Sequence, residues 1–493
     1  MTNTGRPSRA CTACKRRKVK CDEKRPKCHS CQRLNIECAW KEVSFIRQQN
    51  QWAEVLVERR VQKGQKRRNP DILKAGISIP KQLQVGPEIY AISRFYSNYA
   101  YTSGTCPFLY LLAPLYDDTR APACLHYVVP AVALASAARQ LKRRDLMTDA
   151  HRYHGRAIKA LGKGLSDPEV VKHDGTLITV FLMGLYESLV CEREGDGCIS
   201  NQAHNPGRLA ILRLRGPSQL RSKSGRNLFT LLRHEQLVAS FTGEGDLKDE
   251  FSTWMSEHYP PTPIAKIQSQ MYEVSCLIST IRKAVRRRKG EQVLALINKG
   301  MHMEEGLFQS EQVPVNWPKD IDVVKRATGT DRHSDLPAPL SIDATKHFSQ
   351  NIASYVNCTQ ALLRNMYQTV HLHLLRALLG ALPLVHEGSS DTGINIDWLL
   401  QNLWEARVRA LATAICNDAR AAIGEYDRDG QELEAPIVGY GFRAYLQLWP
   451  LQTALEVDHL DPQERKNIVK SLRHIHEVIG IGRAVTNMTE TTI

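Results

Sequence analysis

The sequence has no long hydrophobic run. Its two most apolar stretches, 125–138 and 177–190, contain Pro130 and Glu187 and are 14 residues long each. A helix needs about 20 apolar residues to cross a bilayer. The first ten residues also lack the apolar segment of a secretory signal peptide. We therefore expect core helices at both stretches, no membrane partner, and no route to an oxidising compartment.

Catalytic motifs are missing too. The sequence contains no G-x-S-x-G turn, no Walker phosphate loop, no H-E-x-x-H zinc motif and no dinucleotide glycine fingerprint. Alternating β-branched runs bounded by hairpin turns are nearly absent, which argues against a β-rich domain. The sequence therefore predicts a mainly α protein that is not an enzyme.

Acidic residues are scarce in the first part of the chain. Residues 1–70 contain 19 Lys and Arg but 6 Asp and Glu, a net charge of +13. Residues 71–493 contain 47 and 45, a net charge of +2. Nearly all of the formal charge of +15 therefore lies in the first 70 residues. Such a local excess favours a polyanionic partner, with DNA as the first candidate.

Six of the thirteen cysteines fall in the same segment, with the spacing C-x2-C-x6-C-x6-C-x2-C-x6-C. They are Cys11, Cys14, Cys21, Cys28, Cys31 and Cys38. A C-x2-C pair can hold one metal through two thiolates. Six thiolates are two short of filling two four-coordinate zinc sites, so two of them must be shared. The pattern predicts two zinc ions per chain; the alternative, a set of disulfides, suits a small secreted domain better than a chain of this length.

The six-residue gaps predict where two short helices end. Residues seven apart on a helix are about 10.5 Å apart along its axis, whereas two sulfurs on one zinc are roughly 3.8 Å apart. A helix that begins near Cys14 must therefore end before Cys21, and one that begins near Cys31 must end before Cys38. Residues 15–20 are expected to form the first helix, with its basic end free to enter a DNA groove.

This segment resembles the fungal zinc binuclear cluster (six-cysteine) DNA-binding domain. The resemblance extends to Ala10, Arg17, Lys18, Lys20, Asp22 and Pro26. It departs at Lys15, Asn35 and Trp40, where the family mostly has arginine, glycine and tyrosine; Asn accepts a positive φ more readily than most residues. The resemblance implies that Cys11 and Cys28 bridge the two zinc ions. It assigns Cys14 and Cys21 to one ion, and Cys31 and Cys38 to the other.

The same resemblance implies a nuclear transcription factor that regulates RNA polymerase II genes by binding double-stranded DNA at CGG-type half-sites. The residues expected to contact DNA are Lys15, Arg16, Arg17, Lys18 and Lys20. Lys18 would donate to guanine O6 and N7, and its neighbours would contact phosphates. Two other classes stay open: an all-α enzyme or metabolite-binding protein with an accessory zinc module, and an RNA-binding or zinc-mediated protein-interaction module.

Composition divides the chain into a disordered basic tail (1–10), the cysteine module (11–40), a linker (41–87) and an all-α domain (88–493). Residues 41–62 are expected to form a helix that either pairs two chains into a homodimer or docks on the large domain. Residues 63–68 form a second basic cluster, suited to nuclear import or to phosphate contacts.

Apolar residues recur at helical spacing almost throughout the large domain. The expected helices are 88–101, 122–143, 147–165, 174–192, 204–215, 225–241, 264–288, 292–309, 347–380, 396–424, 437–458 and 463–483. Residues 313–346, with four prolines, are expected to form a long loop. The remaining cysteines are expected to be free thiols; they are Cys106, Cys124, Cys191, Cys198, Cys276, Cys358 and Cys416.

Residues 204–216 resemble part of the fungus-specific regulatory domain of such activators, in the order H-x-x-G, apolar helix, L-R-G. Gly207 is expected to permit a close approach at the helix start, and Gly216 to end the helix. Leu209 and Leu212 are expected to face the core, and Arg215 to cap the helix or pair with a buried acid. Such a domain implies contact with the transcription machinery and leaves a small-molecule effector open.

Overall fold

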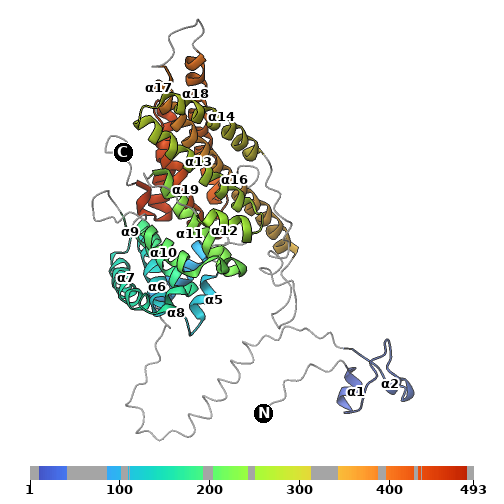
Figure 1. Ribbon diagram of the computed structural model, residues 1–493. Coiled ribbons are helices and arrows are strands. Elements are labelled where there is room, and N and C mark those ends of the chain that lie inside the picture. Colours follow the sequence, from blue (N-terminus) through green and yellow to red (C-terminus); the bar gives the residue numbers. More distant parts are fainter. Residues whose placement is uncertain are drawn as a thin grey trace. The chain divides into compact units, whose positions relative to one another are not determined.

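The computed structural model describes residues 10–40, 86–100, 109, 111–191, 204–242, 250–312, 342–386, 396–426, 431–434 and 436–485. The chain divides into two compact units, Met1–Gln84 and Val85–Ile493 (Figure 1). Helices make up nearly all the regular structure of the described residues. The described residues also contain an isolated antiparallel β-bridge between Tyr426 and Glu432. The predicted fold class, a small cysteine module followed by a large all-α region, is confirmed.

Four predicted features lie wholly or largely outside the described residues. They are the tail before residue 10, the helix over 41–62, the basic cluster 63–68 and most of the loop 313–346. The predicted end of that loop is too late, because helix α16 (Ile342–Ala381) already begins at residue 342.

The first unit contains two five-residue helices, α1 (Thr12–Arg16) and α2 (His29–Arg33). Each begins directly after the first cysteine of a C-x2-C pair, so that Cys11 and Cys28 are the N-cap residues. Helices this short are marginal on their own. The prediction of two short helices is confirmed, but the first ends at Arg16 instead of continuing to Lys20.

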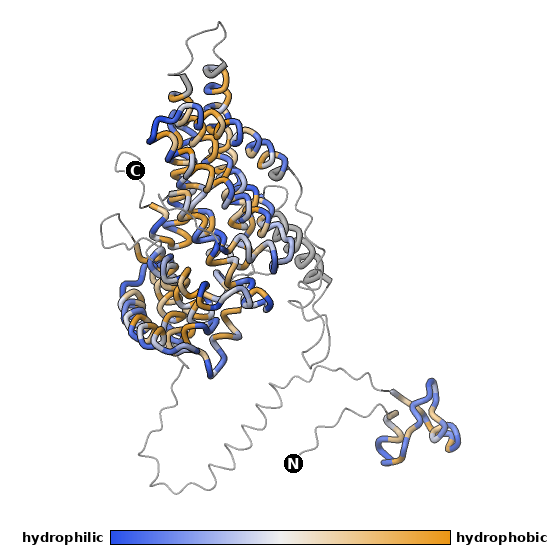
Figure 2. The backbone as a smooth tube through the Cα atoms, viewed as in Figure 1, coloured by the Kyte–Doolittle hydropathy of each residue, from blue (hydrophilic) through white to orange (hydrophobic). Residues whose placement is uncertain are grey.

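Two apolar helices lie at the centre of one end of the second unit. They are α6 (Ala123–Leu141) and α9 (Asp174–Val190), and both are buried almost all round. Helices α4 (Pro87–Phe95) and α7 (Arg144–Gly164) cover α6. Figure 2 shows the polar residues of these helices on the outside. The two stretches that were too short for a membrane span are therefore core helices, as predicted.

The rest of the second unit is built around α16, against which several long helices pack. They are α13 (Pro263–Arg286), α14 (Gly290–Gln312), α18 (Ile396–Ile423) and α19 (Tyr440–Leu455). Helix α20 (Pro462–His474) packs on α18 and α19, and α11 (Lys223–Thr242) on α13 (Figure 1). Buried Arg443 of α19 donates to the carbonyls of Ile423, Ile437 and Val438, and so closes the carboxyl end of α18.

The long predicted helices are present, and most of their ends are shifted by a few residues. The helices predicted over 88–101 and 463–483 end earlier, at Phe95 and His474, and each is followed by a π-helical segment, Tyr96–Ala100 and Ile475–Ile479. Short elements of four to nine residues were missed because so few residues show little periodicity. They are α5 (Leu112–Asp117), α8 (Pro168–Lys172), α12 (Glu250–His258), α17 (Pro383–His386) and the 3-10 turns Pro217–Arg221 and Gly482–Val485.

The stretch 204–216 forms α10 (Asn205–Arg215), which ends at Gly216 with φ 68°. Arg215 reaches the neighbouring helices, where it donates to the Lys172 carbonyl at 2.7 Å and pairs with the Asp174 carboxylate at 2.5 Å. Leu212 is fully buried. The expectation for Gly207 is wrong, because a Cβ atom there would meet nothing within 4 Å.

Most described cysteines of the large unit are free thiols, namely Cys124, Cys276, Cys358 and Cys416. The expectation is wrong for Cys191, which is disulfide-bonded. Cys106 and Cys198 lie outside the described residues. Among the described helices, none combines the length and the apolar composition that a membrane crossing requires.

Candidate metal centre and DNA-binding surface

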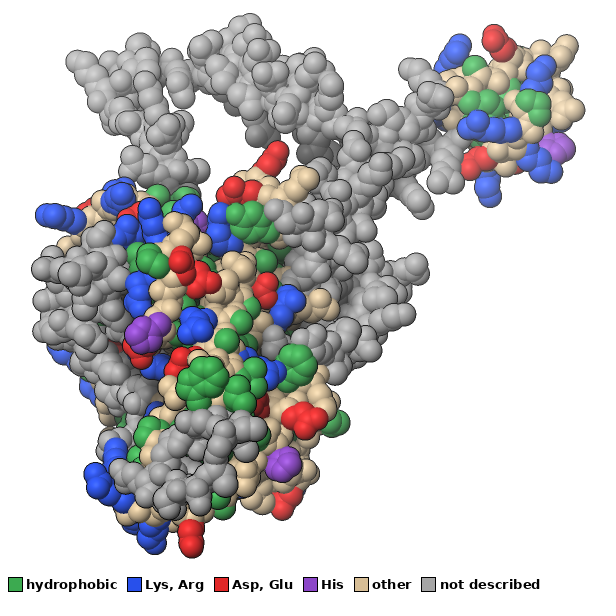
Figure 3. Space-filling model, turned by 90° about the horizontal axis from the view of Figure 1, so that it is seen from above, with side chains coloured by type: hydrophobic (Ala, Val, Ile, Leu, Met, Phe, Trp, Pro, Cys, Tyr) green, Lys and Arg blue, Asp and Glu red, His purple; other side chains and the backbone are tan. Residues whose placement is uncertain are grey.

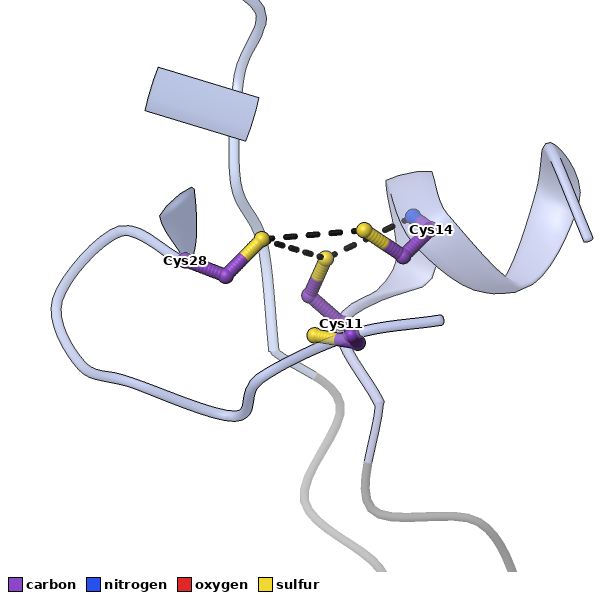
Figure 4. Close-up of side chains that lie close together, drawn as sticks. Cys11, Cys14 and Cys28 are labelled. Carbon is purple, nitrogen blue, oxygen red and sulfur yellow. Dashed lines mark hydrogen bonds between the residues drawn. The ribbon is translucent and has the colours of Figure 1, made fainter. Parts of the chain in front are cut away.

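Sulfur atoms at the starts of α1 and α2 lie at the spacing of zinc ligands (Figure 4). The Sγ atom of Cys11 is 3.7 Å from that of Cys28 and 3.6 Å from that of Cys31. The Sγ atom of Cys14 is 3.6 Å from that of Cys28 and 4.0 Å from that of Cys31. Two thiolates on one tetrahedral zinc are about 3.8 Å apart, so these distances suit metal ligands.

The remaining two cysteines of the module complete two groups of four. In each group all sulfur atoms lie within 4.8 Å of one another. The groups are Cys11, Cys14, Cys21 and Cys28, and Cys11, Cys28, Cys31 and Cys38. The two groups share Cys11 and Cys28, so six sulfurs can supply the eight positions of two tetrahedral sites. A set of ligands made up of thiolates is a preferred environment of zinc, and the residues therefore fit two zinc ions.

The same backbone turn follows both helices and brings the third cysteine of each half back to the metal groups. After α1, Lys18 has φ 52° and the Val19 N–H donates to the Cys14 carbonyl at 3.1 Å. After α2, Asn35 has φ 48° and the Ile36 N–H donates to the Cys31 carbonyl at 3.1 Å. This pattern is a Schellman stop. The predicted break in each half is confirmed, and Asn35 adopts the positive φ expected of it.

The cysteine thiols differ in their acidity. The Cys11 sulfur accepts a hydrogen bond from the Cys14 N–H at 3.4 Å, and this bond, together with contacts to the neighbouring sulfurs, lowers the pKa of Cys11 to about 6. Burial raises the pKa of Cys14 to about 12, and it raises the pKa of Cys31 as well. A thiol must lose its proton to bind zinc. Zinc binding to the buried thiols of Cys14 and Cys31 is therefore accompanied by the release of protons.

Two polar contacts hold the ends of the helices. The Asp22 carboxylate accepts a hydrogen bond at 3.1 Å from the His29 N–H, the first of α2. A carboxylate is favourable at this end of a helix dipole. The Thr12 N–H and hydroxyl both donate to the Ala39 carbonyl at 2.9 Å, and they tie the start of α1 to the end of the module. Asp22 is part of the family resemblance, whereas nothing in the local sequence indicates the role of Thr12.

Trp40 closes the loop between the two halves. Its indole N–H donates to the Pro26 carbonyl at 3.1 Å, and the Arg25 guanidinium lies 5.2 Å from its ring centroid. The peptide bond between Arg25 and Pro26 is cis. These contacts show why an aromatic residue with a hydrogen-bond donor suits a position where the family mostly has tyrosine.

The five residues predicted to contact DNA are all exposed, and they lie at the carboxyl end of α1 or just after it. Lys15 and Arg16 are in its last turn, Arg17 is the C-cap, Lys18 is in the turn and Lys20 follows it. The amino end of α1 carries Cys11 and Cys14, so the basic end is the free one. Figure 3 shows Lys and Arg side chains on the visible face of this unit.

Residues 9–47 match the fungal Zn(2)-Cys(6) binuclear cluster domain. No curated protein and no solved structure matches the chain. Domains of this family bind two zinc ions through six cysteines and bind DNA in fungal transcription factors, which are generally nuclear. Residues 9–47 therefore correspond to a zinc- and DNA-binding domain of the type found in fungal transcription factors.

Proposed function

We propose that this protein is a sequence-specific regulator of RNA polymerase II genes that acts in the nucleus and reads CGG-type half-sites. The proposal rests on one observation above all. Two groups of four cysteines share Cys11 and Cys28, and an exposed basic turn follows the helix that they hold. In this proposal Cys11 and Cys28 bridge the two zinc ions, Cys14 and Cys21 complete one site, and Cys31 and Cys38 complete the other.

The charge of the domain supports DNA as the partner. Residues 10–40 contain nine Lys and Arg and three Asp and Glu, all of them exposed, which gives a net charge of +6. Six thiolates and two Zn²⁺ change this by −6 + 4 = −2, so about +4 remains on a domain of 31 residues. A positive charge density of this kind attracts the phosphate backbone of DNA, whatever the base sequence.

Base reading is assigned to Lys18. The residue lies in the turn at the free end of α1, beyond the cysteines that hold the helix. The major groove is wide enough for a helix end, and guanine presents two acceptors, O6 and N7, to a cationic donor there. Lys15, Arg16, Arg17 and Lys20 surround Lys18 and are assigned to phosphate contacts, which set the position of the helix but carry no sequence information.

The large helical unit is assigned a regulatory role. Its stretch 204–216, which resembles the regulatory-domain pattern, forms a helix that ends at Gly216 and is anchored by Arg215 on Asp174. We propose that this unit contacts the transcription machinery, and that dimerisation through residues 41–62 brings two zinc domains to paired half-sites.

The test of the proposed function is the DNA selectivity of the zinc-loaded full chain. We expect a CGG-containing duplex to be bound roughly 5- to 150-fold more tightly than a scrambled duplex of the same composition, because the base-edge contact assigned to Lys18 contributes about 1–3 kcal/mol. Chelation of zinc should abolish the difference. Equal affinity for the two duplexes, or tighter binding to an RNA hairpin of matched length, would refute the proposal.

A further inference from the structure

The outer face of α18 carries large apolar side chains that are more than half exposed to solvent. Leu399 is 52 % exposed and Leu403 57 %, and Ala406 and Ala410 continue the same face, whereas Trp398, 59 % exposed, lies on one flank of it. The opposite face of the helix holds Trp404, Val408 and Ile415, which are buried. Clusters of exposed apolar side chains on one face mark sites of protein interaction, and tryptophan is prominent among residues that dominate binding energy.

The other half of the same face is hollow. An open depression of about 680 Å³ is lined by residues of α18, of the segment that leads into α20 and of the first turn of α20. These residues are Arg409, Ala410, Thr413, Ala414, Asn417, His459, Asp461 and Glu464. Within α18 the lining is made of small side chains next to Arg409 and Asn417. This face of the helix therefore carries large apolar side chains before Ala406 and an open depression after it.

We propose that α18 pairs with α18 of a second copy of this protein, antiparallel, about a two-fold axis at Ala406. Such an axis places residues that precede Ala406 opposite those that follow it by the same number. Leu399 then lies opposite Thr413, and Leu403 lies opposite Arg409 and Ala410. The large side chains of each copy thus enter the depression of the other. Because of the two-fold axis, the same contact occurs at both ends of the interface, as in isologous dimers.

The charges beside the axis agree with this pairing. Arg409 and Glu405 lie on the same side of the apolar face of α18. In an antiparallel pair, this side of one helix is next to the same side of the other helix. Arg409 of one copy is then within about 3 Å, along the axis, of Glu405 of the other. Arg407, close to the axis, is neutralised within its own chain by Glu304 at 2.8 Å. No pair of uncompensated cations is therefore brought together.

The size of the contact predicts its strength. Residues 398–417 span roughly 29 Å of helix, and one helix pair of that length buries less than the roughly 800 Å² per partner of a stable interface. The dimer is therefore expected to be weak, with a dissociation constant on the order of 10 μM. Such an interface becomes effective when two chains are held close together. It does not depend on DNA binding or on residues 41–62.

The test uses the zinc-loaded full chain without DNA. Cysteines introduced as Leu403→Cys and Ala410→Cys should cross-link when the two variants are mixed, and Ala406→Cys should cross-link to itself at the axis. The control is Ile158→Cys on α7, an apolar position that is 53 % exposed. The wild-type chain, with its thirteen native cysteines, sets the background. Cross-linking no stronger than in the Ile158→Cys control would overturn the proposal.

A second measurement distinguishes a specific dimer from non-specific hydrophobic association. Ala410→Trp adds exposed apolar surface but fills the depression that Leu403 of the other copy enters. With Trp52→Asp in every chain to remove pairing through residues 41–62, we expect sedimentation equilibrium to show association at least tenfold weaker for Ala410→Trp, and also for Leu403→Glu, with no change for Ile158→Glu. Stronger association of Ala410→Trp than of wild type, or a wild-type chain that stays monomeric at about 100 μM, ten times the expected dissociation constant, would contradict the α18 pairing.

Discussion

Replacing Cys28 by serine should release both zinc ions from the protein, whereas replacing Cys21 by serine should release one. Cys28 belongs to both groups of four sulfurs, and Cys21 belongs to one. Structural zinc contributes on the order of 10 kcal/mol to the folding of small zinc domains. The buried cluster of this domain is made of Cys11, Cys14, Cys28 and Cys31, so the metal ligands themselves form its core. Loss of both ions should therefore unfold residues 10–40 and abolish DNA binding.

The measurement is the zinc content per chain, by elemental analysis of the purified full-length variants. Cys124→Ser, which alters a buried free thiol in α6 of the other unit, is the matched control and should keep two zinc ions. Equal losses from the Cys28 and Cys21 variants would show that Cys28 is not shared. A single zinc in the wild-type chain would mean that the four buried sulfurs, those of Cys11, Cys14, Cys28 and Cys31, form one site.

Replacing Lys18 by alanine should remove the preference for CGG over scrambled DNA and leave most of the non-specific binding. A bidentate contact to a base edge contributes about 1–3 kcal/mol of discrimination, which corresponds to roughly 5- to 150-fold in relative affinity. The charge removed is one of nine Lys and Arg in residues 10–40, so the attraction to phosphates falls little. Binding titrations on both duplexes at several salt concentrations measure the two effects separately.

The matched control neutralises four cations that follow residues 10–40 in the sequence. They are Lys63, Lys66, Arg67 and Arg68. These residues can offer charge to phosphates, so neutralising them should weaken binding to both duplexes alike and flatten the salt dependence by about 0.9 for each phosphate that is no longer bound. If Lys18→Ala instead weakened binding to both duplexes equally, Lys18 would be a phosphate-binding residue, and the assigned base reading would be wrong. Zinc content of the variant shows that its domain is folded.

The sequence contained most of what shapes the metal centre. The length of the six-residue gap forbids a continuous helix between Cys14 and Cys21, and the chain obeys this limit with a turn at Lys18. The end of α1 was not predictable to the residue, because it depends on the hydrogen bond from Val19 to Cys14 that closes the turn. The contacts of Thr12 and Arg25 were missed for a related reason. They join residues far apart in the chain, and no local sequence pattern predicts them.

In the large unit, periodicity predicted the helices whose burial is continuous over many turns. Helix α9 was expected from its apolar run and is buried as expected. The role of Gly207 was wrongly inferred, since a glycine before an apolar helix says nothing about what lies next to it in space. The face of α18 shows the same limit. Leu399 and Leu403 have helical spacing in the sequence, but only the packing of α16 and α19 on the opposite face reveals that they are exposed.

Two zinc ions are expected to create the surface that reads DNA, and returning zinc to the metal-free full chain measures this dependence. Binding to CGG and scrambled duplexes is followed while the ratio of zinc to protein is raised. We expect the preference for CGG to appear in step with the second zinc and to be complete at two zinc ions per chain. A preference that is present without zinc, or complete at one ion per chain, would contradict a DNA-reading surface built by two ions.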